Sequence, residues 1–377
     1  MRFRVQREVL AEAVAWAARS LPARPPVPVL AGLLVEAGDD GVVLAGFDYE
    51  VSARVGVDAE VVEPGRVLVS GRLLADICRS LPQQPVEIAT DGAKVVVRCG
   101  SARFTLLTLP VDEYPALPVM PTASGSLPGD VFAAAVAQVS LAAGRDDTLP
   151  VLTGVRVEID GEKVVLAATD RYRLAVRELA WTPEEAGLSA VALVPARTLS
   201  ESARSLQAGE KVVVALATGG TGEGLVGFEG GRRRTTTRLL DGEFPKYQSL
   251  LPTSSASVAV VETGPFVDAV KRVSLVAERN TPIRLSFTDG ALTLEAGSGE
   301  EASASESMDA TLEGDDIAIA FNPQYLLDGL QAIDAPYAQL SFTTSTKPAV
   351  VTGRATADTE PTGDYRYLLM PVRLSGA

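Results

Sequence analysis

The segment Pro28-Val29-Leu30-Ala31-Gly32-Leu33-Leu34-Val35-Glu36 returns 122 residues later as Pro150-Val151-Leu152-Thr153-Gly154-Val155-Arg156-Val157-Glu158. Asp48 has its counterpart, Asp170, at the same distance. A period this long indicates duplicated whole domains, because the units of a solenoid are only about 20 to 50 residues long. We therefore predict similar domains in a row.

Further repeats set the number of these domains. Residues 69–74 and 79–81 resemble residues 194–199 and 204–206 at an offset of 125, and a weaker third copy occupies residues 282–294 and 321–327. The chain has 377 residues, which is more than one hydrophobic core usually serves. The sequence predicts three domains, with bounds 1–121, 122–252 and 253–377.

The composition is that of an ordinary globular protein, with 46% hydrophobic and 5% aromatic residues. No apolar run approaches the roughly 18 residues of a membrane helix, and residues 1–6 resemble a strand rather than a signal sequence. We expect a cytoplasmic protein that makes no membrane contact. Cys78 and Cys99 are too few for a disulfide scaffold and are expected to be buried or half-buried thiols, one on a helix and one at a strand end.

Each third has the pattern strand, helix, several strands, then a second strand, helix and strands. Apolar residues three to four positions apart mark the first helix of each third, and shorter helices are predicted at 72–81, 197–206 and 323–333. In the last third Thr263 is the predicted helix cap. The fold class is α+β, with two helix-on-sheet halves per domain. The apolar faces are Val9, Leu10, Ala13, Val14 and Ala17; Val131, Phe132, Ala135, Val136 and Val139; and Phe266, Val267, Val270 and Val273.

The charge is unevenly distributed. The net charge is −14, whereas the six predicted helices and their ends carry ten basic and eight acidic side chains. An acidic chain ordinarily does not bind nucleic acid, because affinity for phosphates comes from clustered Lys and Arg. Charged residues on exposed helix faces are usually just solvated. The excess of basic groups on the helices would be relevant to nucleic-acid binding only if the helices share one surface.

The residue types of common active sites are missing or explained otherwise. The chain has no histidine, which excludes His-dependent triads, bases and metal ligands, and it has no phosphate-binding Gly-x-x-x-x-Gly-Lys-Ser/Thr loop. Residues 219–224 are interpreted as a hairpin, Asp48 and Asp170 as a duplicated turn residue, and residues 232–234 as a solvated strand. We expect no catalytic residue, metal or cofactor, and a hydrolase would lack a nucleophile.

Five motifs in this order resemble the bacterial β sliding clamp family over the whole chain. The resemblance implies three similar domains per chain and a ring of two chains, with helices lining the hole and sheets outside, around duplex DNA. The motifs are Arg24-Pro25-Pro26-Val27-Pro28-Val29-Leu30, Ala168-Thr169-Asp170-Arg171-Tyr172-Arg173-Leu174-Ala175, Leu240-Asp241-Gly242-Glu243-Phe244-Pro245-Lys246-Tyr247, Phe321-Asn322-Pro323-Gln324-Tyr325 and Leu369-Met370-Pro371-Val372-Arg373-Leu374.

The resemblance also explains the charge pattern. A ring held on DNA by topology needs only a weakly positive lining, since a protein that neutralised many phosphates would slide poorly. No base readout is expected, because sliding must be indifferent to sequence. By position in the family pattern the residues facing DNA are Arg24, Arg72, Arg79, Arg197, Arg204, Lys271, Arg272 and Arg279.

The resemblance further implies a pocket for short linear peptides of the replicative polymerase, the clamp loader and repair proteins. Leu and aromatic anchors would supply most of the affinity. Arg171 stands where many relatives have Gly, which leaves the peptide preference open. The carried-over pocket residues are Leu152, Thr169, Tyr172, Arg173, Leu174, Pro245, Leu250, Leu368 and Met370, with Asn322, Tyr325, Pro371 and Val372 adjoining.

A homodimer would join the first domain of one chain to the third domain of the other. Opposite charges around an apolar contact would orient this joint. The implied interface residues are Arg98, Arg103, Phe104 and Leu106 on one side, and Leu275, Val276, Glu300, Glu301 and Glu306 on the other. The alternative is a repeat-built protein scaffold that keeps the peptide cleft but does not encircle DNA.

Overall fold

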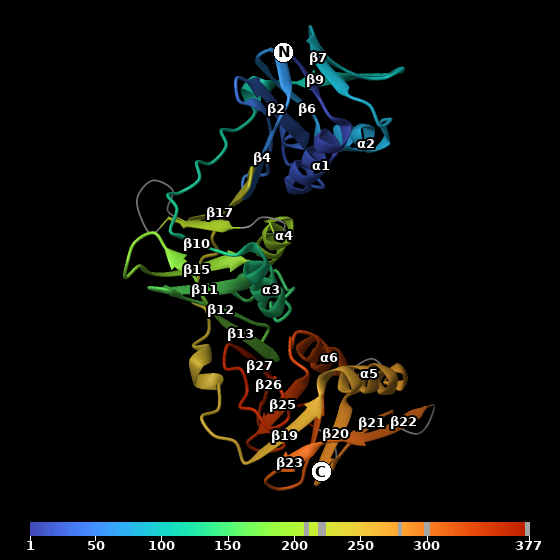
Figure 1. The fold of residues 1–377 in the computed structure, drawn as a ribbon, viewed down its shortest axis with the longest axis vertical. Helices are drawn as coiled ribbons and strands as arrows, with labels where there is room; N and C mark the ends of the chain where they lie inside the picture. Colours follow the sequence, from blue (N-terminus) through green and yellow to red (C-terminus); the bar gives the residue numbers. More distant parts are fainter. Residues whose placement is uncertain (207–210, 218–223, 278–280, 298–301, 374–377) are drawn as a thin grey trace. The chain divides into compact units, whose positions relative to one another are not determined.

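The computed structural model describes residues 1–206, 211–217, 224–277, 281–297 and 302–373. The chain forms two compact units (Figure 1). Unit 1 contains Met1–Ala133, Thr182–Leu188 and Glu201–Leu239, and unit 2 contains Ala134–Trp181, Ser189–Ser200 and Leu240–Ala377. The middle third of the sequence therefore contributes one group of strands to each unit.

Unit 1 is built on one antiparallel sheet of fourteen strands among the described residues, in the order β14-β10-β16-β17-β18-β4-β3-β2-β6-β9-β8-β7-β1-β5. Strands of the first and middle thirds meet where β18 pairs with β4, for example at Thr235 opposite Ala53. The strands are β1 (Arg2–Val5), β2 (Gly32–Gly38), β3 (Gly41–Phe47), β4 (Val51–Val57), β5 (Glu60–Glu63), β6 (Gly65–Ser70), β7 (Val86–Asp91), β8 (Lys94–Cys99), β9 (Ala102–Leu109), β10 (Gly125–Leu127), β14 (Thr182–Pro183), β16 (Val212–Leu216), β17 (Leu225–Gly230) and β18 (Arg233–Arg238).

Unit 2 contains, within the described part of the chain, a nine-stranded sheet, β15-β11-β12-β13-β27-β26-β25-β19-β23, and a four-stranded sheet, β22-β21-β20-β24. Strands of the middle and last thirds meet where β13 pairs with β27, at Leu174 opposite Leu368. The strands are β11 (Gly154–Asp160), β12 (Lys163–Thr169), β13 (Arg173–Ala180), β15 (Ser189–Pro195), β19 (Ser257–Glu262), β20 (Ile283–Thr288), β21 (Ala291–Gly297), β22 (Ser303–Asp309), β23 (Thr311–Glu313), β24 (Ile317–Phe321), β25 (Tyr337–Phe342), β26 (Ala349–Arg354) and β27 (Tyr365–Leu369).

Six α-helices lie in the described residues, where the sequence predicted them. In unit 1, α1 packs beside α2 and against β3 and β4, and in unit 2, α5 packs beside α6 (Figure 1). Their apolar faces are buried, which removes them from water and stabilises each helix on its sheet. The helices are α1 (Arg7–Ala17), α2 (Gly71–Ser80), α3 (Gly129–Ser140), α4 (Ala196–Leu206), α5 (Thr263–Val273) and α6 (Pro323–Gln331).

Three details of the helix predictions were wrong. Val9 and Val131 expose 43% and 38% of their surface, because each lies at the margin of its helix face, whereas Trp16 is 6% exposed and belongs to the core. Thr263 does not cap α5, since it is the first helical residue and the cap position is Glu262. The hydroxyl of Thr263 is buried without a hydrogen-bond partner.

The sequence repeat is a structural repeat. Residues 28–36 and 150–158 both form one 3₁₀ turn that leads into a seven-residue strand, β2 or β11. The duplicated turn predicted at Asp48 and Asp170 is confirmed. Asp48 accepts hydrogen bonds from the amides of residues 50 and 51 at 2.9 and 2.6 Å, and Asp170 accepts them from residues 172 and 173, both at 3.0 Å.

Both cysteines are buried free thiols, as predicted, with Cys78 on α2 and Cys99 at the end of β8. Burial raises the pKa of the Cys78 thiol to about 12, so this thiol stays protonated and unreactive at neutral pH. In the part of the chain that the structure describes, every helix is too short or too polar to cross a membrane.

Candidate functional site

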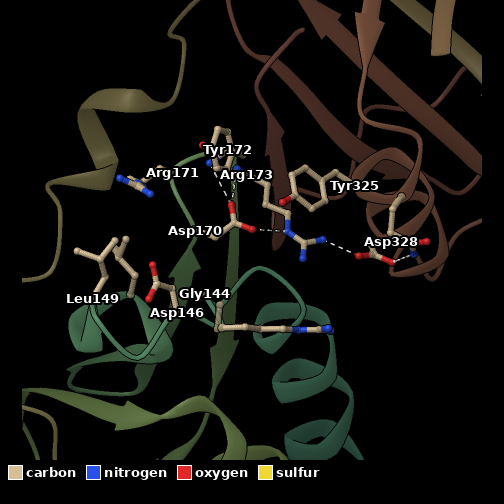
Figure 2. A pocket seen from close by; sticks show the side chains of 13 residues that line it. Gly144, Asp146, Leu149, Asp170, Arg171, Tyr172, Arg173, Tyr325 and Asp328 are labelled. Atoms are coloured by element: carbon tan, nitrogen blue, oxygen red, sulfur yellow. Dashed lines mark hydrogen bonds and ion pairs between the residues drawn. The ribbon is translucent and has the colours of Figure 1, made fainter. Parts of the chain in front are cut away.

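A tight turn between β12 and β13 starts the site. The side chain of Asp170 accepts the two amide hydrogen bonds described above, and Arg171 adopts φ = 80°, a left-handed conformation that non-glycine residues rarely take. The Thr169 hydroxyl donates to the Arg173 carbonyl at 2.7 Å and closes the turn. Tyr172, 55% exposed, stands at the rim of the turn (Figure 2).

Arg173 connects this turn to α6. Its Nε donates to Asp170 Oδ2 at 3.0 Å and its Nη1 to Asp328 Oδ2 at 2.6 Å, while its side chain is only 7% exposed (Figure 2). Burial disfavours the charged guanidinium, but Tyr367 and the two carboxylates outweigh that effect and raise the pKa of Arg173 above its ordinary value. The group is therefore a permanent cation with fixed orientation, which holds α6 against the turn.

Two tyrosines form an aromatic wall beside this ion network. The rings of Tyr172 and Tyr325 stack with centroids 6.3 Å apart, and the Arg173 guanidinium lies 4.3 Å from the Tyr325 centroid. Tyr325 is placed by the start of α6, where Asn322 Oδ1 accepts from the amides of Gln324 and Tyr325 at 3.0 and 3.1 Å. Pro323 occupies the first helical turn, as the Asn-Pro sequence suggests.

These elements enclose a cleft of about 810 Å³ within unit 2. Its size suits a small ligand or a few residues of a peptide. The wall is mixed, with aliphatic and aromatic side chains interrupted by three cations and three carboxylates. The lining residues are Ala143, Gly144, Arg145, Asp146, Leu149, Leu152, Asp170, Arg171, Tyr172, Arg173, Gln324, Tyr325 and Asp328.

Four of the predicted pocket residues line this cleft, namely Leu152, Tyr172, Arg173 and Tyr325. Three others are buried: Thr169 in the turn, and Leu174 and Leu368 in the core across the β13–β27 pairing. They support the cleft rather than face it. The remaining predicted residues lie outside its lining and are Pro245, Leu250, Asn322, Met370, Pro371 and Val372.

Some of these outlying residues form an exposed apolar rim. Leu250, Met370 and Val372 expose 50%, 40% and 37% of their surface. Met370 adjoins the cleft, because its amide donates to the carbonyl of Tyr172 at 2.9 Å. At Met370, exposed apolar surface thus continues beyond the lining of the cleft.

Sequence reasoning missed the charged lining. Gln324 and Asp328 are one helical turn apart, and the Gln324 amide donates to Asp328 Oδ1 at 2.7 Å. Helical spacing from Tyr325 could have indicated Asp328, which is three residues further along α6. Nothing in the sequence indicated that Asp146 and Leu149, on the loop that follows α3, would face the turn at residues 170–173.

The predicted DNA-facing cations that the structure describes are exposed and lie on helices or beside one. Arg24 precedes η2 (Pro28–Ala31), and Arg72 on α2 donates to the Pro22 carbonyl at 3.2 Å, so this loop and α2 meet. Arg79 pairs with Asp76 at 3.2 Å, and Lys271 with Asp268 at 3.4 Å. Arg197 and Arg204 lie on α4, and Arg272 on α5, whereas Arg279 is outside the described residues.

The predicted interface residues also have defined places. On β9, Arg103 and Phe104 are exposed, but Leu106 is 3% exposed and packs in the core of unit 1. Its neighbour Leu107, which strand alternation places on the opposite face, is 71% exposed.

On the other side, Leu275 exposes 85% of its surface, and its neighbour Val276 is half-buried. Two of the predicted charges already have partners: Arg98 pairs with Glu87 at 3.2 Å, and Glu306 accepts two hydrogen bonds from Arg272 at 2.5 and 3.0 Å. Glu300 and Glu301 lie outside the described residues.

Comparison with known proteins places this geometry in one family. The N-terminal, central and C-terminal domains of the DNA polymerase III beta subunit match residues 1–118, 126–246 and 248–373. The beta sliding clamp of Streptomyces coelicolor is 68% identical over 376 residues and covers all of both chains. The chain belongs to the DNA polymerase III beta subunit family. A beta clamp of this family is a processivity factor and not a catalytic subunit, so the chain is not an enzyme.

Solved clamp structures have the same fold. The sliding clamp of Bacillus subtilis superimposes with a TM-score of 0.91 over the full length of both chains at 28% identity. A Pseudomonas aeruginosa clamp bound to griselimycin gives a TM-score of 0.90 at 29% identity, and the match covers 99% of this chain and all of that one. The fold is therefore that of three sliding-clamp domains with α+β architecture.

Proposed function

We propose that the protein is a DNA sliding clamp. As a ring-shaped homodimer it encircles duplex DNA, tethers the replicative polymerase and other replication and repair proteins, and confers processivity. Each copy contributes three clamp domains, 1–121, 122–252 and 253–377, with helices facing the hole and sheets outside. The observation that carries the proposal is a strand pairing that recurs at each domain joint.

The joints follow one rule. Each third contains a three-stranded meander, β2-β3-β4, β11-β12-β13 or β20-β21-β22, and ends with one strand, β9, β18 or β27. The last strand of a meander pairs with the final strand of the next third, as β4 does with β18 and β13 with β27. Among the described residues β22 pairs only with β21, so its other edge has no partner strand.

The strand that this rule assigns to β22 is β9. Along residues 102–107, β9 pairs with β8 alone in the described structure, and its exposed side chains include Arg103, Phe104 and Leu107. An open strand edge is a template for another chain. Pairing β9 of one copy with β22 of a second, in both directions, gives a head-to-tail dimer that closes.

The charge distribution supports encirclement without tight grip. The described basic residues assigned to DNA are exposed, and several are partly neutralised by neighbours, such as Arg79 by Asp76. Each neutralised phosphate adds to the salt-dependent affinity, so few strong contacts leave the ring free to slide. The net charge of −14 keeps other surfaces from binding nucleic acid.

The cleft of unit 2 and its apolar rim are proposed to receive short linear peptides of the partners. The stacked pair Tyr172 and Tyr325 and the exposed Met370 offer the aromatic and flexible apolar surface that binds Leu and Phe anchors. The clamp from Pseudomonas aeruginosa that was solved with griselimycin supports ligand binding by this family.

Retention on DNA tests the ring. With a clamp loader, the protein should persist on nicked circular DNA and slide off the linear form. Arg24→Ala should lower loading or retention, whereas Arg66→Ala, which removes an exposed arginine on strand β6, serves as the control. Equal retention of Arg24→Ala and wild type would count against this DNA surface. Absence of retention on circles, with peptide binding intact, would favour the scaffold alternative.

Peptide binding tests the cleft separately. A labelled Gln-Leu-type peptide should bind the wild type and lose affinity in Met370→Ala. Val119→Ala is the control, because Val119 exposes 85% of its surface and lies in unit 1. Equal affinity of the wild type and Met370→Ala would remove the rim from the proposed site.

A further inference from the structure

The two ends of the cleft differ in how their charges are used. At one end Arg173 is buried between Asp170 and Asp328, so its hydrogen-bonding capacity is directed into the protein. At the other end lies Arg171, on the far side of Asp170 from Arg173 and above Leu149 and Asp146 in the view of Figure 2. The first end stabilises the fold, whereas the second faces whatever enters the cleft.

Arg171 is an exposed cation whose guanidinium makes no ion pair within 4.0 Å in the described structure. Its charge acts on Asp146, which is already engaged, because the Oδ1 of Asp146 accepts from the hydroxyl and amide of Thr148 at 2.6 and 3.0 Å. These hydrogen bonds lower the pKa of Asp146, and the charge of Arg171 contributes further. The planar guanidinium therefore keeps its donors for a ligand.

The backbone at this position does not require arginine. The turn needs a positive φ, which glycine adopts without steric cost. Its equivalent in the first third has Tyr49 at φ = 77° beside 80° for Arg171, so the strain belongs to the turn and occurs in both repeats. The feature that distinguishes Arg171 is its place in the lining of the cleft. An exposed cation in the lining of a cleft, without an ion pair in the described structure, is a reason to look for its ligand.

We propose that Arg171 is a specificity residue that binds a carboxylate of the docked peptide, namely an Asp or Glu side chain close to the apolar anchors. The inference rests on the peptide-binding function proposed above. A guanidinium presents paired N–H donors that match the two oxygens of a carboxylate. The apolar rim would then supply affinity for any suitable anchor, while Arg171 selects partners with acidic flanks.

The test is a peptide scan by fluorescence polarisation with the full-length protein. All peptides share one Gln-Leu-type core, and each carries one Asp, or the isosteric Asn, at a single position before, within or after it. Exposed ion pairs are weak, so the best Asp peptide should bind the wild type about two- to fivefold more tightly than its Asn partner at ~0.1 M salt. The difference should shrink at higher salt.

Three variants test whether Arg171 causes the preference for Asp peptides. R171Q removes the charge but keeps a polar side chain and the backbone demand, and R171G also relieves the positive φ. Y49G gives the same backbone relief in unit 1 and is the matched control. We expect R171Q and R171G to bind Asp and Asn peptides equally while keeping wild-type affinity for the Asn series, and Y49G to discriminate as the wild type does.

The outcomes separate this inference from the proposed function. Failure of every peptide to bind the wild type would overturn the peptide cleft and the inference with it. Binding without any Asp preference, or preference retained in R171Q, would overturn the inference alone. An equal loss of affinity for Asp and Asn peptides in R171Q would also overturn the inference, since Arg171 would then be a general peptide contact. A variant that loses only retention on circular DNA would overturn it as well, since Arg171 would then contact phosphate.

Discussion

Removal of the Asp328 carboxylate should destabilise unit 2 selectively. In Asp328→Ala, Arg173 loses its 2.6 Å hydrogen bond and keeps its ion pair with Asp170 at 3.0 Å. Breaking a fully buried pair costs about 3–5 kcal/mol. Asp328 is a quarter exposed and Arg173 retains its other carboxylate partner, so the loss should approach that of one charged hydrogen bond, about 2 kcal/mol.

Urea unfolding followed by tryptophan fluorescence measures this loss. Trp181 lies in unit 2 and Trp16 in unit 1, so a Trp16→Phe background reports on unit 2. For a unit of this size, about 2 kcal/mol corresponds to a Tm decrease of roughly 4–8 °C.

The control substitution is Asp76→Ala, read through Trp16 in a Trp181→Phe background. It breaks the exposed pair of Asp76 with Arg79 on α2, whose side chains are 69% and 72% exposed. This pair should contribute less than about 0.5 kcal/mol. If Asp328→Ala destabilises unit 2 as little as Asp76→Ala destabilises unit 1, the network around Arg173 does not hold the turn and α6 together.

Three further predictions concern other parts of the fold. Gly329→Ala should destabilise unit 2 by about 1–3 kcal/mol in urea unfolding, because the new Cβ would lie 2.3 Å from Cε1 of the fully buried Tyr367. Alanine normally favours helices over glycine, so a gain in stability would contradict this packing. The hydrogen bond from Arg272 lowers the pKa of Glu306, so the pair stabilises the fold above the unfolded-state pKa of Glu306 and loses that effect as pH falls through its folded-state pKa. In Arg272→Ala, an NMR titration should show the pKa of Glu306 shifted back toward its ordinary value. Leu275→Asp should weaken the proposed dimer by more than about 1 kcal/mol in light scattering without lowering monomer stability, since Leu275 is 85% exposed in the single chain, and an unchanged dimer would exclude it from the joint.

Local features of the fold could be predicted from the sequence. The helix at residues 72–81 was expected within one residue of α2, because apolar spacing and turn residues act over a few positions. The turn function of Asp48 and Asp170 was also predictable, because each aspartate bonds the amides two and three residues ahead. Duplication of the sequence made these local rules visible two or three times.

The cleft could be predicted only in part. Family resemblance identified Leu152, Tyr172, Arg173 and Tyr325, but it also included Leu174, whose strand register places it in the core. Register depends on which strand lies alongside, and a shift of one residue exchanges the buried and exposed faces. The burial of Leu106 beside the exposed Leu107 has the same cause.

The sequence by itself determined the repeated domains, the six helices and the aspartate turns, because these depend on residues close together in the chain. Tertiary structure alone decided that Arg173 meets Asp328 across 155 positions, and that the loop bearing Asp146 faces Arg171. Such contacts arise from packing whole elements together. A side chain's partner is then set by the path of the backbone, for which the sequence near that residue carries no signal.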